Sequence, residues 1–238
     1  MNIQKMPIDF YVEKLRQGQH YTFARYGDGE WNAIKGKRGC NCDKHEYYPA
    51  LGKALKRGFI KPVRDPSYMY ALQTQTDLTK RGDVQDFFRA HMSDIMLYDS
   101  DVFHCASEAG TLFPLVEQLR KMHCCIVGPA ELRAMREGVL VYEGFVETPS
   151  KNCFLQLDYI RDKVLRYADV VTGQGVVYCF SASMATEVLL YELWPKLGRD
   201  NWMIDFGSLW DVYVGHNSRK YHSRIPEDVK KKNMGTLK

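Results

Sequence analysis

Chemistry on phosphate groups is first suggested by the segment Arg25-Tyr-Gly-Asp-Gly-Glu30, which ends a strand-like run over 21–26. In an extended or turning backbone, residues i and i+2 project to the same side. We therefore expect Asp28 and Glu30 to reach one point, with no side chain on Gly29 between them. Two adjacent carboxylates repel each other unless a cation neutralises them. Mg²⁺ or Mn²⁺ suits such a pair, because it takes one or two carboxylates and completes its shell with water and phosphate oxygens.

The neighbours of this acidic pair favour a ligand that carries phosphates. Arg25 supplies a permanent positive charge suited to phosphate, and Gly27 and Gly29 leave the approach open. The pattern indicates metal-assisted handling of a nucleoside diphosphate. The alternative is a solvated turn, because Asp-Gly is common in hairpins and acidic pairs on loops usually face water.

Other polar groups stand near the ends of predicted strands. Ser181 and Ser183 open a helix, where hydroxyls and free backbone N–H groups form a phosphate site or simply cap the helix. Asp205 ends a predicted buried strand. It is a candidate base, metal partner or ligand of a sugar hydroxyl, and the alternative is a scaffold role. His45 lies in a loop that follows the acidic motif and is a candidate group on the acceptor side. Arg219 is predicted to fold back over the phosphates, unless it belongs to a solvated tail.

Helical and strand-like segments alternate along the chain. Helical patterns cover 8–16, 48–60, 84–97, 112–122, 130–136, 152–168 and 184–194. Strand-like runs cover 21–26, 68–72, 102–106, 123–128, 138–146, 175–180 and 202–206. This alternation predicts the α/β class, with a Rossmann-like, doubly wound, mainly parallel sheet and helices on both faces. Because ligands bind beyond the carboxyl ends of strands in such sheets, we expect Asp28, Gly128, Ser181 and Asp205 to converge there.

The composition is that of a folded protein. Of 238 residues, 45% are hydrophobic and 13% aromatic, which is enough for a sizeable core and argues against disorder. No apolar signal region opens the chain, and no run approaches the roughly 18 apolar residues of a membrane span. Seven irregularly spaced cysteines favour a reducing compartment, so we expect a cytoplasmic protein. Cys40, Cys42 and His45 form an alternative zinc set without an evident fourth ligand.

The positive charge gathers at one end. Residues 216–238 contain seven Lys/Arg and two Asp/Glu, a net +5, whereas the whole chain carries +4. We therefore predict one α/β domain over 1–215 and a basic C-terminal tail over 216–238. Such a tail meets phosphate, nucleic acid or an acidic membrane surface, or else is solvated and partly mobile.

Three segments together resemble the GT-D-fold glycosyltransferases, bacterial and phage proteins with an Asp-x-Glu motif in a Rossmann-like domain. They are the acidic motif, Gly128-Pro-Ala-Glu131 and Ile204-Asp-Phe-Gly-Ser208, within a likeness from about Tyr21 to Gly215. Some members of the family carry a histidine where this chain has Ser208.

The resemblance implies a nucleotide-sugar donor, with a UDP-sugar preferred, and a divalent metal at Asp28 and Glu30. It also implies that Arg25 lies near the diphosphate and that the turns at Gly128 and at 181–183 border the nucleotide.

The sequence therefore predicts a metal-dependent glycosyltransferase. The metal would neutralise the charge of the departing diphosphate, and Arg25 and helix N-terminal amides would add to this. If the reaction inverts, Asp205 or His45 takes the proton of the acceptor. The residues predicted to bind the donor are Arg25, Gly27, Gly29, Gly128, Ser181, Ser183, Ser208 and Arg219.

Two alternatives belong to other functional classes. One is a metal-dependent phosphohydrolase or phosphotransferase acting on nucleotides, and the other is a nucleic-acid-binding module that uses the basic tail. A third hypothesis combines nucleic-acid binding with sugar transfer: the tail docks DNA and the acceptor is a modified base. A glycan is the other acceptor that we consider.

Overall fold

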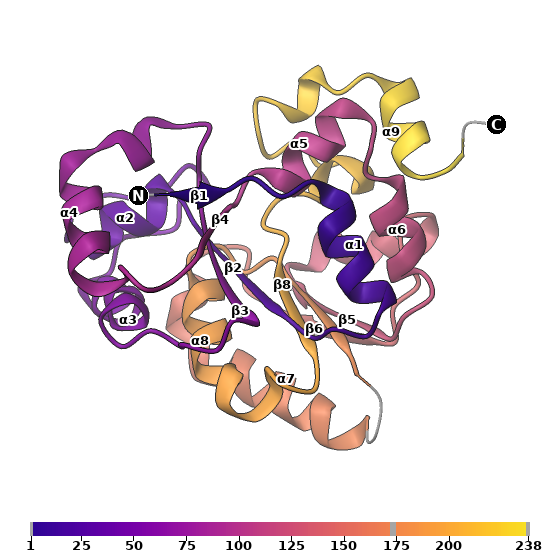
Figure 1. Ribbon diagram of the computed structural model, residues 1–238. Coiled ribbons are helices and arrows are strands. Elements are labelled where there is room, and N and C mark those ends of the chain that lie inside the picture. The colour runs from indigo at the N-terminus through magenta and orange to yellow at the C-terminus, as the bar shows by residue number, and fades with distance from the viewer. Residues whose placement is uncertain (1, 172–174, 237–238) are drawn as a thin grey trace.

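Eight strands form a single sheet at the centre of the molecule (Figure 1). The computed structural model describes residues 2–171 and 175–236, and within them all strand pairings are parallel. The spatial order of the strands is β1-β4-β3-β2-β8-β7-β5-β6. Their bounds are β1 Ile3–Gln4, β2 Thr22–Tyr26, β3 Tyr68–Leu72, β4 Leu97–Asp99, β5 Cys124–Gly128, β6 Gly144–Glu147, β7 Val177–Phe180 and β8 Trp202–Asp205.

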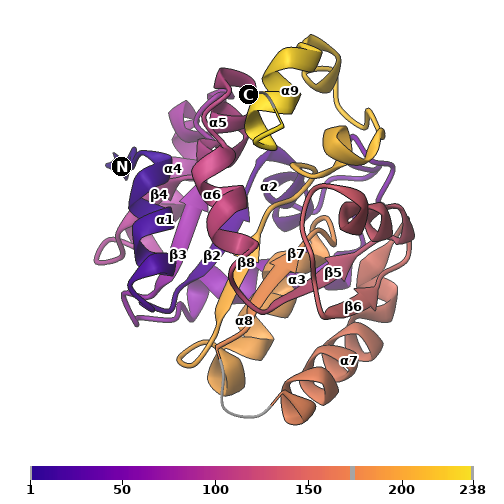
Figure 2. The same cartoon turned by 90° about the vertical axis from the view of Figure 1, so that its right-hand side faces the viewer.

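Helices cover both faces of this sheet, as Figures 1 and 2 show. One face carries α1 Ile8–Arg16, α5 Val102–Ala109, α6 Phe113–Leu119 and α9 Glu227–Asn233. The other face carries α2 Asp28–Ile34, α3 Pro49–Ile60, α4 Gly82–His91, α7 Leu157–Val170 and α8 Ala185–Leu197. Short 3₁₀ helices lie at η1 Asp77–Lys80, η2 Ala130–Glu137, η3 Cys153–Gln156, η4 Asp211–Val214 and η5 His222–Arg224. The predicted α/β class, with a doubly wound parallel sheet and helices on both faces, is confirmed.

The sequence produces these elements through its apolar pattern. All five residues of β5 are buried, because helices cover both faces of a parallel strand and leave no face for polar side chains. Helix α1 buries Tyr11, Val12 and Leu15 in one stripe. The helix stops before Gly18, which has φ +69°, a left-handed conformation that glycine adopts without steric cost.

The predicted strand over 102–106 is wrong, because this segment begins helix α5. Val102, Phe103, Ala106 and Ser107 are its buried residues, and their spacing places them on one face of a helix. The helix has only eight residues, so the β-branched and aromatic residues at its start outweighed its periodicity in the sequence.

Further segments also differ from the prediction. The helix expected over 84–97 ends at His91, and Leu97 already belongs to the three-residue strand β4. The strand expected over 138–146 is reduced to β6, and the helix expected over 130–136 is the 3₁₀ helix η2. Strand β1 was not predicted, because two residues carry no periodicity.

The segment 216–236 packs against the rest of the molecule. Asn233 is fully buried, and its amide group accepts from the backbone N–H of Leu112 at 3.0 Å and donates to the carbonyl of Ser107 at 2.7 Å. His222 is also fully buried. This basic segment is therefore part of the packed structure. Over residues 2–171 and 175–236, every helix is too short or too polar to cross a membrane.

Candidate functional site

The chain reverses its course across the sheet between β2 and β8. From β2 it continues to β3 and β4 on one side, and it later returns through β7 to β8 on the other. Loops that follow such a pair of strands diverge and leave a crevice at their carboxyl ends. A cavity of about 350 Å³ occupies this crevice, and we call it the switch-point cavity. Arg25, Asp28, Glu30, Asp205 and Gly207 are among the residues that line it.

The acidic motif opens helix α2 instead of forming an extended turn. Helical residues two positions apart point in directions roughly 200° apart, so the expectation that Asp28 and Glu30 project to the same side is wrong. Asp28 is exposed, whereas Glu30 folds back and accepts a hydrogen bond from the backbone N–H of Gly27 at 2.7 Å. Burial raises the pKa of Glu30 to about 7. Both carboxylates nevertheless line the switch-point cavity.

Arg25 presents an unpaired guanidinium to this cavity. Its Nε and Nη1 atoms are buried and have no hydrogen-bond partner. The guanidinium lies against Gly207, where a Cβ atom would come within 2.4 Å of Nη1. Gly207 also has φ +55°, so both the turn and the close approach require glycine. Because buried N–H groups without partners are costly, an anionic ligand would stabilise this arrangement.

A pair of buried carboxyl groups lies beneath the acidic motif. Glu187 on α8 is 2% exposed and Asp205 is 5% exposed, and the two carboxyl groups contact each other. Burial and the charges of Asp205 and Glu30 raise the pKa of Glu187 well above its ordinary value, so its carboxyl group keeps its proton at neutral pH. Asp205 also accepts from the backbone N–H of Gly207 at 2.8 Å.

The sequence interpretation missed Glu187. The available signal was a glutamate inside the mainly apolar run Met184–Leu190, because a charge on a buried helix needs a partner.

His104 is a second residue that the sequence interpretation missed, because its segment was read as a strand. It lies on α5, lines the switch-point cavity and has a buried Nδ1 atom without a hydrogen-bond partner. Burial and the charges of Arg25 and Arg219 hold the pKa of His104 well below its usual range, so the ring is neutral. The ring of Tyr221 packs edge-on against it at 5.5 Å.

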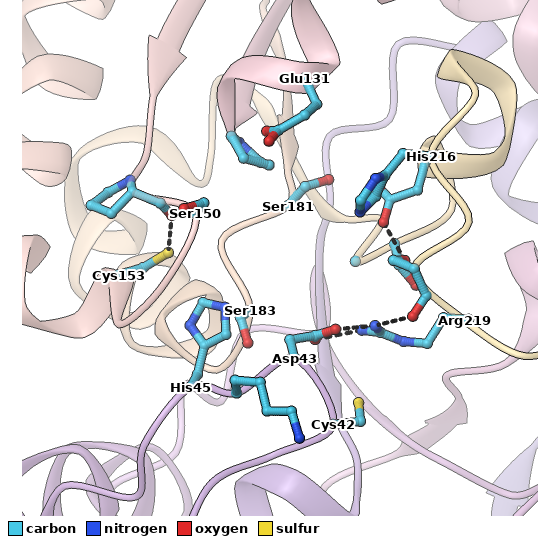
Figure 3. Close-up of a pocket in the computed structure, with 17 residues that line it drawn as sticks. Cys42, Asp43, His45, Glu131, Ser150, Cys153, Ser181, Ser183, His216 and Arg219 are labelled. Carbon is cyan, nitrogen blue, oxygen red and sulfur yellow. Dashed lines mark hydrogen bonds and ion pairs between the residues drawn. The ribbon is translucent and has the colours of Figure 1, made fainter.

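A second cavity of about 340 Å³ adjoins the first. Arg219 and Asp43 lie on the boundary, where the guanidinium donates to both carboxylate oxygens (Figure 3). His45, Glu131 and Ser150 line the second cavity alone.

The structure brings most of the predicted site residues into these two cavities. Those that line the switch-point cavity alone are Arg25, Gly27, Asp28, Gly29, Glu30 and Asp205. Those that line the second cavity alone are His45 and Ser181, and those that line both are Ser183, Ser208 and Arg219. Gly128 lines neither: a Cβ there would come within 2.7 Å of Leu132, so this glycine serves the packing of η2 on β5.

No three His, Cys, Asp or Glu side chains within 2–171 and 175–236 are grouped as a metal-binding set. The zinc alternative at Cys40, Cys42 and His45 therefore has no support in the described part of the chain.

Comparison with solved structures identifies the class of the fold. The chain is 18% identical to "A New Glycosyltransferase (DUF1792) from Streptococcus sanguinis", with a TM-score of 0.61 over 92% of this chain and 87% of the other. It is 19% identical to a second structure, which is described as having "a distinct glycosyltransferase fold", with a TM-score of 0.61 over 90% and 83% of the two chains. The third, a selenomethionine form of domain of unknown function 1792, gives 0.62 at 19% identity.

This chain thus has the fold of the domain of unknown function 1792, as the resemblance to GT-D proteins implied. No family model and no curated protein matches the sequence.

Proposed function

We propose that this chain is a glycosyltransferase that moves a sugar from a nucleotide-sugar donor to an acceptor with the help of a divalent cation. The observation that carries the proposal is the unpaired Arg25 guanidinium beside the carboxylates of Asp28 and Glu30. The guanidinium suits a phosphate group, and the ends of parallel strands at a switch point are where such folds bind nucleotides. The likeness in fold to a solved glycosyltransferase supports the same assignment.

The charge of the switch-point cavity supports a cation. Six acidic side chains besides the protonated Glu187, and two arginines, are among the described residues that line it: Asp28, Glu30, Asp43, Asp101, Glu108 and Asp205 against Arg25 and Arg219. Such a surface repels a diphosphate unless a cation accompanies it. Mg²⁺ or Mn²⁺ suits the carboxylate donors and needs only one or two of them, because phosphates and waters complete its shell. Asp28 and Glu30 are the residues that would hold it.

In the proposed reaction, an acceptor oxygen forms a bond to C1 of the sugar while the bond from C1 to the diphosphate oxygen breaks. The electron pair of that bond leaves with the diphosphate. A bound cation supplies Lewis-acid stabilisation of this charge, and Arg25 and Arg219 add hydrogen bonds to phosphate oxygens. In an inverting reaction Asp205 takes the proton from the acceptor, for which a carboxylate in the cavity wall is suited.

His45 is better suited to binding than to proton transfer. Its Nδ1 atom accepts a hydrogen bond from the backbone N–H of Asn152 at 3.0 Å, so in the neutral ring the proton is on Nε2. The lone pair that a base needs is therefore already in use. Burial lowers the pKa of His45, which keeps the ring neutral.

The nucleoside would lie against the aromatic rings of the switch-point cavity, since Tyr47, His104 and Tyr221 line it. Gln73 and Gln75 in the same wall offer amide donors and acceptors to the edge of a base. A UDP-sugar is the donor that we prefer, on the resemblance of the acidic motif.

A binding screen and one substitution test the proposal. UDP-, GDP- and TDP-sugars, each with and without Mn²⁺, should be compared in thermal-shift measurements, because ligand binding stabilises the folded state by mass action. Glu30→Gln keeps an oxygen that accepts from Gly27, so we expect an intact fold, no Mn²⁺-dependent stabilisation by the donor and no turnover. Glu137→Gln, at a residue that lines neither cavity, is the matched control.

Three results would oppose the proposal. A Glu30→Gln protein that is still stimulated by metal contradicts the metal assignment. Phosphate release without an acceptor indicates the phosphohydrolase alternative. Steeply salt-dependent nucleic-acid binding that survives Asp28→Asn, with no response to any nucleotide sugar, indicates the binding-module alternative.

A further inference from the structure

The second cavity contains an unusual concentration of strained backbone. Within the described residues, three that are not glycine have φ in the left-handed region: Lys44 at +66°, Asn152 at +55° and Ser183 at +53°. Lys44 and Ser183 line the second cavity, and Asn152 lies between Ser150 and Cys153, which also line it. Each such residue costs on the order of 1 kcal/mol or more, and such strain tends to cluster where a site must be held in one shape.

Hydrogen bonds explain how these conformations persist. Asn41 Nδ2 donates to Ser183 Oγ at 3.0 Å, and the backbone N–H of Glu46 donates to Asn152 Oδ1 at 2.9 Å. The backbone N–H of Asn152 in turn donates to His45 Nδ1. The loop over 41–46 is thereby tied to the turn after β7 and to the loop after β6, and the Asp43–Arg219 pair ties it to the C-terminal segment. Four separate loops therefore hold this cavity in a preformed shape.

Hydroxyls are the most frequent kind of polar group on its walls. Five serines line the second cavity: Ser150, Ser181, Ser183, Ser208 and Ser218. Ser181 Oγ is buried and has no hydrogen-bond partner. His45 adds a donor at Nε2, and Glu131 adds a carboxylate acceptor. A ligand with several hydroxyl groups, each both donor and acceptor, matches this set.

The same walls are poorly suited to a nucleobase or to a polyanion. No Phe, Tyr or Trp is among the described residues that line the second cavity, so a flipped base would find only the small imidazole rings of His45 and His216 to stack on. Three acidic side chains, Asp43, Glu131 and Asp211, line it against two cationic ones, Lys44 and Arg219. A phosphate-bearing strand therefore gains little electrostatic attraction here.

We propose that the second cavity is the acceptor site and that it binds an uncharged, hydroxyl-rich ring, a sugar residue, and not a base in nucleic acid. This inference rests on the proposed function, because the second cavity is an acceptor site only if the switch-point cavity binds the donor. The boundary at Asp43 and Arg219 then separates the two substrates, and Ser183 and Ser208 face both.

Saturation-transfer difference NMR tests this site without knowledge of the natural acceptor. The probes are methyl β-glucoside, methyl β-galactoside and methyl β-N-acetylglucosaminide, with the full chain, UDP and Mn²⁺ present. We expect signals from the sugar ring protons of at least one probe. Glu131→Ala should weaken its binding about tenfold, because it removes a charged hydrogen-bond acceptor. Glu131 is exposed, so the fold should tolerate this change, and Glu137→Ala on the same 3₁₀ helix is the control.

The outcomes separate this inference from the proposed function. Sugar signals that UDP leaves in place, that fall in Glu131→Ala and that persist in Glu137→Ala support the acceptor site. Signals that UDP displaces, equal signals in Glu131→Ala and the wild type, or signals only from a single-stranded DNA 12-mer overturn it. If sugar binding depends on Glu131 but no nucleotide sugar stabilises the protein, the second cavity is still a sugar site and the transferase proposal is refuted.

Discussion

The proton held by Glu187 should make the stability of this protein fall as the pH rises. The folded state keeps that proton above pH 4.5, the ordinary pKa of the side chain, whereas the unfolded chain releases it. The folded state therefore binds more protons, and the free energy of unfolding decreases with pH by about 1.4 kcal/mol per unit until the raised pKa is reached. Between pH 5 and 6 this contribution from Glu187 alone is about 1.4 kcal/mol.

Glu187→Gln isolates this contribution. The amide is neutral at every pH and still donates a hydrogen bond to Asp205, so the variant should fold and should lack the Glu187 slope. Relative to wild type, its free energy of unfolding should rise by about 1.4 kcal/mol from pH 5 to pH 6. Urea denaturation at half-unit pH intervals measures this difference directly.

A control on the same helix excludes a general effect of removing charge. Glu192 pairs with Arg161 at 3.0 Å near the surface, so Glu192→Gln should lower the stability by a constant of at most about 1 kcal/mol over this range. Parallel pH curves for Glu187→Gln and the wild type would refute the assignment of a proton to the buried pair.

Three other perturbations follow from particular contacts. In Gly52→Ala the new Cβ would lie 2.1 Å from a carbonyl oxygen of α2. We therefore expect the free energy of unfolding to fall by about 3 kcal/mol in urea denaturation. The control Gly82→Ala, where the space is open, should lose less than about 1 kcal/mol. Burial lowers the pKa of His222 to about 4. Acidification from pH 6.5 to 5 should therefore lower the free energy of unfolding of the wild type by about 2 kcal/mol more than that of His222→Gln. Equal losses in circular-dichroism melts would contradict this. Arg219→Gln should weaken UDP binding about fivefold in calorimetry. Asp43→Asn should not weaken it, because Asp43 competes with phosphate for the Arg219 guanidinium. Weaker binding in both variants would argue that the ion pair itself is required.

The apolar strands in the middle of the sheet were the most predictable part of the fold. Runs such as Cys124–Gly128 and Tyr68–Leu72 are apolar throughout, as strands covered on both faces must be. Elements that depend on tertiary contacts were less predictable. Helix α2 begins within a glycine-rich motif that also suits a turn, and α5 is too short for its period to outweigh its β-branched start.

The candidate site was predictable in its location and less so in its detail. Asp28, Glu30 and Asp205 were found because polar residues after buried strands must converge at one edge of a parallel sheet. The orientation of Glu30 was not predictable, because it depends on a hydrogen bond from the backbone N–H of Gly27 at the N-terminus of α2 to its carboxylate. The partners of the second cavity were also beyond the sequence, since hydrogen bonds such as Asn41–Ser183 join residues 142 positions apart.

The packed segment over 216–236 also has a consequence for biosynthesis. Arg219 and Tyr221 form part of the wall of the switch-point cavity, and Met234 is buried in the hydrophobic cluster that includes residues of α5 and α6. A nascent chain that has emerged only as far as Gly215 carries every strand and yet has an open-sided cavity. The wall of the switch-point cavity is thus completed only after residues that add nothing to the sheet have left the ribosome.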